Sequence, residues 1–265
     1  MILKIDGHPT GEMSLYAAGN ALQGAEGSTA TLTISRTPRE VFDVQVTRAK
    51  ISTKSVDYKV CDSGNQKVVG YLRVSNFNKM TAEDVLDALE AFKQKGVELE
   101  VLDIRNNGGG VFNAGVQVAR MLIDSGDLVL IADSDGVRDV YQAEGEAIDS
   151  KTPMVVLVNK GTASASEVLA GALKDNNRAR IAGENTFGKG LIQTLVPLSD
   201  GSAVTVTVSK YQTPNGIDIN KKGITPDLRL SEYEMERIPA GSGKFCSWAA
   251  SDEAETLQEK IGILG

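Results

Sequence analysis

The spacing of apolar residues predicts a short β-rich segment followed by a longer region in which strands and helices alternate. In the first segment, alternating apolar positions predict strands at 2–5, 29–34 and 41–46, and a 3.6-residue period predicts a helix at 14–23. From about residue 66, apolar runs predict strands at 68–74, 99–104, 128–132 and 154–158. Amphipathic helices are expected between them, at 81–92, after 110 and through 173. This order is typical of an α/β domain.

The chain becomes β-rich again after residue 180. Strands are expected at 191–196 and 203–210, and a short helix at 253–261. We therefore expect two domains, residues 1–52 and residues 53–265, of which the second holds the α/β core.

Composition narrows the classes of partner. The 265 residues carry a net charge of −7, and the acidic balance without a basic run argues against nucleic acid and against anionic lipid. Proteins or peptides are the expected partners. No apolar run reaches the length of a transmembrane helix, and no charged-then-apolar leader precedes Gly7, so neither a membrane span nor a signal peptide is predicted.

Cysteine chemistry is limited to two residues. Cys61 and Cys246 are too few for a zinc cluster and too far apart for a CxxC redox motif. A long-range disulfide and two buried free thiols remain equally acceptable. Neither a metal nor a cofactor is expected.

Two glycine-rich stretches imitate nucleotide-binding motifs without completing them. The cluster at 108–110 would need glycine at position 113 for a dinucleotide fingerprint, and Asn113 is there. Residues 183–189 match the start of a phosphate loop, but Gly190 replaces the required serine or threonine. The following residues also alternate like a strand, so no helix N-terminus would receive a phosphate.

Acyl chemistry fits the same region better. The single histidine, His8, lies in an unrelated segment, so a lysine is the expected base for a serine nucleophile. Lys189 lies between two glycines and beside Phe187 and Leu191, and burial there would favour the neutral amine. Glycines at 108–110 and the helix start near residue 164 offer N–H groups for an oxyanion. Local spacing leaves three possible nucleophiles, Thr162, Ser164 and Ser166.

Each of these features also has a structural explanation. Ser164 and Glu167 fit a capping box at a helix start. Lys189 fits a solvated surface lysine, and the glycine run fits a tight strand-to-helix turn.

Four motifs together resemble the carboxyl-terminal processing (tail-specific) serine peptidases. They are VLDIRNNGGG at 101–110, GTASASE at 161–167, GKG at 188–190 with Gln193, and GITPD at 223–227. The resemblance implies that Ser164 is the nucleophile, Lys189 the base and Gln193 the residue that orients the lysine. It further implies an oxyanion hole formed by the N–H groups of Gly110 and Ala165, and supporting charged residues at Asp103, Arg105 and Glu167.

The resemblance also sets expectations for fold and substrate. It implies a ClpP/crotonase-like α/β peptidase core with a partial PDZ module at residues 1–52 whose first half is absent. The match is nearest to the plant, algal and cyanobacterial branch. That branch implies removal of the C-terminal extension of the photosystem II D-one precursor in the chloroplast thylakoid lumen, by a monomer at most peripheral to the membrane. A general tail-specific protease, a noncatalytic PDZ-type scaffold and a crotonase-type acyl-CoA enzyme remain alternatives.

Overall fold

The computed structural model divides the chain into two compact units, Met1–Thr53 and Lys54–Gly265. It describes residues 1–37, 40–49, 54–61, 68–145, 147–251 and 259–261. The expected helix at 253–261 therefore lies almost entirely outside the described residues. The other expected strands and helices are present, and the α/β fold class is confirmed.

The first unit is a four-stranded antiparallel sheet with one α-helix. The strand order is β2-β1-β3-β4, and the bounds are Ile2–Ile5 for β1, His8–Pro9 for β2, Thr29–Thr37 for β3 and Glu40–Thr47 for β4. A 3₁₀ turn, Thr10–Glu12, leads to α1, Leu15–Leu22. The Ser14 hydroxyl caps α1 by accepting a 3.1 Å hydrogen bond from Ala17 N–H. Leu15 at the start of α1 is 96% exposed.

The second unit is built on a six-stranded sheet of order β14-β11-β10-β7-β6-β5. Five strands are parallel and β5 is antiparallel to β6. The bounds are Val56–Cys61 for β5, Val69–Val74 for β6, Leu99–Asp103 for β7, Met154–Val158 for β10, Arg180–Gly183 for β11 and Leu228–Arg229 for β14. The central strands β7 and β10 are buried throughout, as their apolar runs predict.

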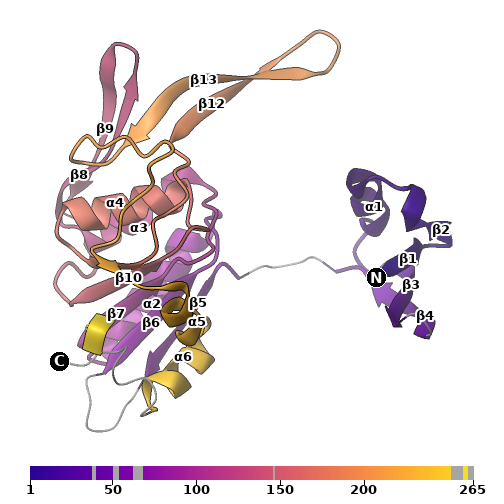
Figure 1. Ribbon diagram of the computed structural model, residues 1–265, viewed down its shortest axis with the longest axis horizontal. Coiled ribbons are helices and arrows are strands. Elements are labelled where there is room, and N and C mark those ends of the chain that lie inside the picture. Colours follow the sequence, from indigo (N-terminus) through magenta and orange to yellow (C-terminus); the bar gives the residue numbers. More distant parts are fainter. Residues whose placement is uncertain (38–39, 50–53, 62–67, 146, 252–258, 262–265) are drawn as a thin grey trace. The chain divides into compact units, whose positions relative to one another are not determined.

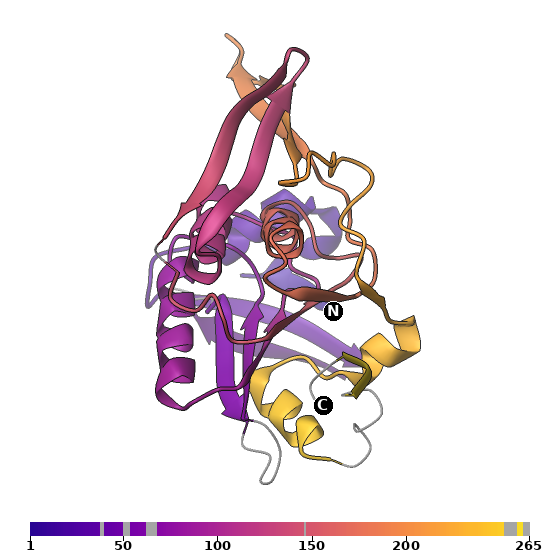
Figure 2. The ribbon, with the colours of Figure 1, turned by 90° about the vertical axis from the view of Figure 1, so that its left-hand side faces the viewer.

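Helices cover both faces of this sheet: crossover helices between parallel strands lie on one face, and helices that follow the last strand lie on the other. One face carries α2, Thr81–Gln94, with α3, Phe112–Leu122, and α4, Ala165–Asp175. The opposite face carries α5, Glu232–Arg237, and α6, Ser242–Ala249 (Figure 2). Successive strand residues point to opposite faces, so Leu102 packs in the first core and Val101 in the second. No helix among the described residues combines the length and apolar character that crossing a bilayer requires.

Two hairpins form a separate sheet of order β12-β13-β8-β9 (Figure 1). The bounds are Ser125–Asp133 for β8, Gly136–Glu144 for β9, Leu191–Pro197 for β12 and Ala203–Gln212 for β13. β13 pairs with β8 only where Lys210–Gln212 lies opposite Leu130–Ala132. The last residues of β13, at the base of the β12–β13 hairpin, therefore pair with β8 close to the β8–β9 turn, and the rest of the β12–β13 hairpin projects beyond this pairing (Figure 1).

A disulfide between Cys61 and Cys246 fastens α6 to β5. The sequence left pairing and free thiols open, and the structure shows pairing. Ser242 at the start of α6 donates through its N–H and its hydroxyl to Asp57, with both bonds 2.7 Å long. The C-terminal helix is thus attached to the sheet by a covalent bond and by hydrogen bonds.

Removing this disulfide is expected to destabilise the protein by up to about 5 kcal/mol, because the two cysteines are 185 residues apart and long loops lose most chain entropy on cross-linking. A Cys61→Ser, Cys246→Ser double variant should unfold at a clearly lower denaturant concentration than the oxidised protein. The reduced wild-type protein is the matched control and should resemble the double variant. Equal unfolding midpoints for all three would contradict the prediction.

Glu100 is a buried carboxyl group without a hydrogen-bond partner on either oxygen. Arg178 lies 3.6 Å away, but its hydrogen bonds go to the carbonyls of Leu122, Thr152 and Asp149. Burial, reinforced by the charge of Asp149, raises the pKa of Glu100 to about 8, and Arg178 only partly opposes this. The group is therefore protonated in the folded protein at neutral pH.

Glu100 should make the protein less stable in base. Its folded pKa is raised, so its contribution is fully present below the unfolded value of about 4.5 and is lost as pH rises through about 8. The loss is on the order of a few kcal/mol. Urea unfolding of wild type and Glu100→Gln between these pH values measures it, and the variant should lose less stability. Parallel pH curves for the two proteins would show that Glu100 ionises normally.

Candidate active site

Ser164 occupies a tight turn between β10 and α4. Its φ of 59° and ψ of −120° lie where a non-glycine residue is rarely found. Such strain concentrates at functional sites, and nucleophilic serines are known on strained strand-to-helix turns that expose the hydroxyl at the end of a sheet. Ser164 is half-buried rather than enclosed. The strained turn and the partial exposure of Ser164 are therefore the features expected of a nucleophilic serine.

The two other hydroxyl groups in the segment are fully buried and already bonded. Thr162 Oγ1 donates to the carbonyl of Ile104 at 2.9 Å and accepts from Asn159 N–H at 3.1 Å. Ser166 Oγ donates to the carbonyl of Asn107 at 3.0 Å. Both hydroxyls fasten neighbouring loops together, which favours Ser164 among the three candidates.

The Glu167 carboxylate joins the serine turn to the lysine loop. It is fully buried and accepts four hydrogen bonds. Oε2 accepts from Ser164 N–H at 2.9 Å and from Lys189 N–H at 2.8 Å. Oε1 accepts from the Thr186 hydroxyl and from Gly188 N–H, each at 2.6 Å. One oxygen atom binds both Ser164 N and Lys189 N, so the distance between these two nitrogens cannot exceed the sum of the two hydrogen-bond lengths.

The capping explanation and the catalytic explanation of Ser164 are compatible. Glu167 makes the glutamate half of a capping box, because its carboxylate accepts from Ser164 N–H. The carbonyl of Ser164 accepts from Glu167 N–H at 2.8 Å and from Val168 N–H at 3.0 Å. The backbone of Ser164 thus starts the helix, and the function of its hydroxyl is a separate question.

The expected burial of the Lys189 side chain is wrong for this conformation. Lys189 is exposed, and its neighbour Phe187 is 65% exposed. The reason is the close approach of the loop backbone to a neighbouring turn, because a Cβ on Gly190 would overlap the backbone of Asn220. With the backbone on the inside, the lysine side chain points outward.

No hydrogen bond joins the Gln193 and Lys189 side chains in the described part of the chain. The Gln193 amide donates to Thr207 Oγ1 at 3.3 Å, across the β12–β13 hairpin. The strand pairing shifts register between Ile192 and Gln193, and such bulges redirect side chains near active sites. Orientation of the lysine by Gln193 remains a prediction.

Two N–H groups near Ser164 are without an acceptor among the described residues, those of Gly110 and Ala165. Gly109 C=O and Val111 N–H both bond to the Phe77 backbone, so the N–H of Gly110 points to the other side. A Cβ on Gly109 would lie 2.8 Å from Ser164 Cβ and 3.0 Å from Ala165 N. Glycine there keeps a space open beside the serine and the free amides.

Asn107 connects the glycine loop to the serine turn, and sequence reasoning gave it no role. Its side-chain oxygen accepts from Gly109 N–H and its amide donates to the carbonyl of Val74, both at 2.9 Å. Its own carbonyl accepts from Ala163 N–H at 2.9 Å. Asn107 lies inside a motif, but no local pattern shows which distant backbone groups it binds.

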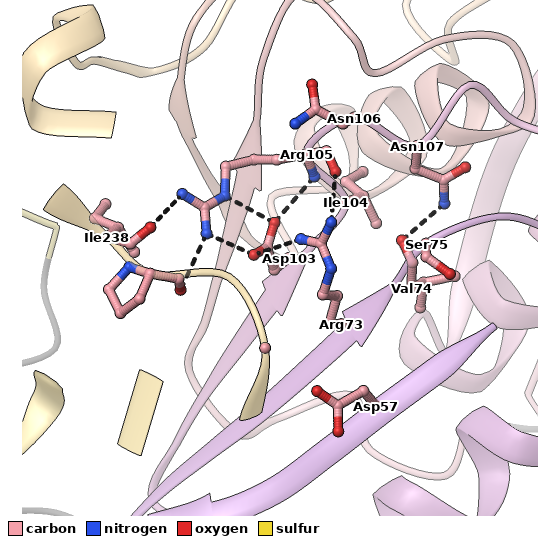
Figure 3. A network of polar contacts seen from close by, with 12 residues as sticks. Asp57, Arg73, Val74, Ser75, Asp103, Ile104, Arg105, Asn106, Asn107 and Ile238 are labelled. Atoms are coloured by element: carbon pink, nitrogen blue, oxygen red, sulfur yellow. Dashed lines mark hydrogen bonds and ion pairs between the residues drawn. The ribbon is translucent and has the colours of Figure 1, made fainter. Parts of the chain in front are cut away.

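Asp103 and Arg105 lie on the sheet face that carries α5 and α6, across the sheet from α4. Arg105 donates to both oxygens of Asp103, at 2.9 and 2.6 Å, and Arg73 donates to the same carboxylate at 3.0 Å (Figure 3). Arg105 also donates to the backbone carbonyls of the C-terminal segment, at Met235, Ile238 and Pro239. These residues fix the end of β7, from which the glycine loop starts, rather than touching Ser164.

The Asp103 carboxylate forms ion pairs with two guanidinium groups, those of Arg73 and Arg105. Burial alone would raise the pKa of Asp103, but the hydrogen bonds and charge of Arg105, with Arg73, hold it below its usual value. Burial and the neighbouring Asp103 raise the pKa of the Tyr71 hydroxyl, which donates to Asp103 at 2.7 Å. In the described part of the chain, no three histidine, cysteine or carboxylate side chains gather into a metal-binding group.

Comparison with known proteins identifies close relatives. The chain is 48% identical to the chloroplastic C-terminal processing peptidase of Tetradesmus obliquus, over 97% of this chain and 57% of the relative. It is 44% identical to the chloroplastic carboxyl-terminal-processing peptidase 2 of Arabidopsis thaliana, over 93% of this chain and 48% of the relative. The chain thus spans about half the length of these relatives.

A solved structure shares the same fold. The photosystem II D1 C-terminal processing protease superposes with a TM-score of 0.74 and 50% identity, over 96% of this chain and 68% of that one. The model of peptidase family S41 matches residues 68–230, which include the serine turn, the lysine loop and the glycine loop. The chain therefore belongs to peptidase family S41.

Proposed function

We propose that the chain is a serine endopeptidase with a Ser164–Lys189 dyad, and that it removes the C-terminal tail of a protein substrate. The observation that carries the proposal is the Glu167 carboxylate, which binds the backbone of both residues through one oxygen. The flexible four-carbon stem of Lys189 allows its amine to turn from solvent toward the serine hydroxyl.

In the proposed reaction, the neutral amine of Lys189 takes the proton of Ser164 Oγ as the oxygen attacks the scissile carbonyl. The N–H groups of Gly110 and Ala165 receive the negative charge that develops on the carbonyl oxygen. Lys189 then protonates the leaving amine, and a water molecule hydrolyses the acyl-enzyme. Gln193 orients the lysine once its side chain leaves Thr207.

Asp103, Arg105 and Glu167 are proposed as positioning residues. Glu167 holds the two catalytic loops together, and the Asp103–Arg105 pair fixes the start of the glycine loop. Their contacts with the backbone support these roles.

The proposed substrate is the precursor of the photosystem II D-one protein, and the proposed compartment is the chloroplast thylakoid lumen. The names of the chloroplastic relatives and of the D1-processing structure support this assignment. The first unit, Met1–Thr53, is proposed to be part of a PDZ module because of its strand, turn, helix and strand order. We further propose a monomer that is at most peripheral to the membrane.

The test combines cleavage with labelling of the nucleophile. The chain should cut a synthetic peptide of the D-one C-terminal extension at one bond, as seen by mass spectrometry, and a fluorophosphonate should label Ser164. A chain that binds the peptide, is not labelled and does not cut would instead be a peptide-binding scaffold. Turnover of an acyl-CoA without peptide cleavage would favour the crotonase-type alternative.

A further inference from the structure

A cavity of about 340 Å³ lies at the carboxyl ends of β6, β7, β10 and β11, on the sheet face that carries α5. Residues at the ends of these strands line one side of it, and α5 with the segment that follows it lines the other. Open α/β sheets bind ligands at the carboxyl ends of their strands, and cavities of this size hold small molecules. Ser164 and Lys189 are not among the residues that line it.

The inner part of the cavity has an excess of positive charge. The guanidinium groups of Arg73 and Arg105 share the single carboxylate of Asp103 (Figure 3). Arg105 uses all five of its N–H donors, two on Asp103 and three on backbone carbonyls. Arg73 uses two, on Asp103 at 3.0 Å and on the Arg105 carbonyl at 3.4 Å. Its remaining donors have no acceptor in the described part of the chain.

The neighbouring side chains do not supply this acceptor. Asp57 lies opposite Arg73 in the β5–β6 pair, but its two oxygens accept from the N–H and the hydroxyl of Ser242. Figure 3 shows Asp57 apart from the Arg73 guanidinium group. The Tyr71 hydroxyl donates to Asp103 and brings no negative charge. Arg73 can therefore bind the carboxylate of a ligand, for which a guanidinium group offers two parallel hydrogen bonds.

The rim of the cavity has the opposite excess of charge. Lys160 Nζ lies 3.7 Å from Glu184 and 3.5 Å from Glu232, so one amine faces two carboxylates. Glu236, an exposed residue of α5, adds a third carboxylate to the lining. The rim therefore favours a positively charged group on a ligand, while the inner part favours a negatively charged one.

We propose that this cavity binds a small zwitterion, a free α-amino acid or a dipeptide with an apolar side chain. Its carboxylate pairs with Arg73, its ammonium group lies among the rim glutamates, and its side chain packs against Met235 and Ile238, which also line the cavity. The rim would repel a ligand with only a carboxylate, and Arg73 would repel one with only an amine. The site is separate from the proposed peptidase function and does not rest on it.

The first test compares ligands that differ by one charge. Isothermal titration calorimetry is performed with L-leucine, the dipeptide Ala-Leu, L-leucinamide and 4-methylpentanoate. We expect at least one zwitterion to bind, and leucinamide and 4-methylpentanoate to bind at least about tenfold more weakly, because each lacks one charge-assisted contact. Tighter binding of leucine would identify a free amino acid as the ligand, and tighter binding of Ala-Leu a dipeptide. Absence of zwitterion binding, or equal binding of a singly charged analogue, would overturn the proposal.

The second test locates the bound zwitterion with variants. Arg73→Lys should weaken binding about tenfold, because an ammonium group keeps the charge but not the two parallel donors. Glu236→Gln should weaken it about threefold, since an exposed charge pair contributes less. Glu90→Gln, at an exposed position of α2, is the matched control and should bind as wild type does. Glu236 is exposed, so its variant tests the site even if Arg73→Lys does not fold. Wild-type affinity in the folded variants would place the ligand elsewhere and refute the proposal.

Discussion

Replacing Ser164 or Lys189 by alanine is expected to abolish peptide cleavage, with a loss of roughly 10⁴–10⁶-fold in kcat for each variant. The serine supplies the oxygen that forms the acyl-enzyme, and the lysine supplies the proton transfers on both sides of that intermediate. Because the two side chains act as a unit, the double variant should be hardly slower than either single one. Single-turnover cleavage of a tail peptide measures all three.

The hydroxyl groups beside Ser164 provide the controls. Ser166→Ala and Thr162→Ala each remove a buried hydrogen bond, to Asn107 and Ile104 respectively, and should cost roughly 1–3 kcal/mol of stability. Both proteins should still cut the peptide at a substantial rate and react with a fluorophosphonate. A Ser166→Ala protein that is folded but as inactive as Ser164→Ala would assign the nucleophile to Ser166.

The core sheet could be predicted from sequence because its strands are short apolar runs. β10 coincides with the expected strand at 154–158, and all five of its residues are buried. Other elements had weaker signals. β9 is exposed along most of its length and forms by pairing with β8, so no apolar run marks it. α6 is held by Cys246 and by contacts with β5, which are distant in sequence.

The candidate site could be predicted only in part from the sequence. Motifs identified Ser164, Lys189 and Glu167, but no pattern in the chain could show that one carboxylate oxygen would bind the backbone of the other two. Apolar neighbours suggested burial of Lys189, whereas the glycine beside it places the backbone on the inside and the side chain outside. The position of the Glu167 carboxylate and the exposure of Lys189 both depend on tertiary contacts between loops. Such contacts leave no periodic pattern in the sequence.

Glu167 should be essential for activity although it is not expected to touch the substrate. Glu167→Ala would leave the N–H groups of Ser164, Gly188 and Lys189 without their acceptor, together with the Thr186 hydroxyl. Each such buried donor costs about 1–3 kcal/mol, so the alanine variant should also be markedly less stable. Displacement of the lysine loop by even about 1 Å should lower kcat about 10²-fold or more.

Glu167→Gln separates positioning from stability. The amide keeps the shape of the side chain but has only one acceptor oxygen, whereas the carboxylate accepts two hydrogen bonds on each of its two oxygens. One pair of donors must then face the amide NH₂ group. We expect a folded protein with KM close to wild type, kcat lowered about 10²-fold and slow fluorophosphonate labelling of Ser164. Glu184→Gln is the matched control and should keep wild-type kinetics, because Glu184 follows β11 and its carboxylate is partly exposed beside Lys160. If Glu167→Gln also kept wild-type kcat, Ser164 and Lys189 would not need the shared carboxylate oxygen. That oxygen would then no longer support the proposed Ser164–Lys189 dyad.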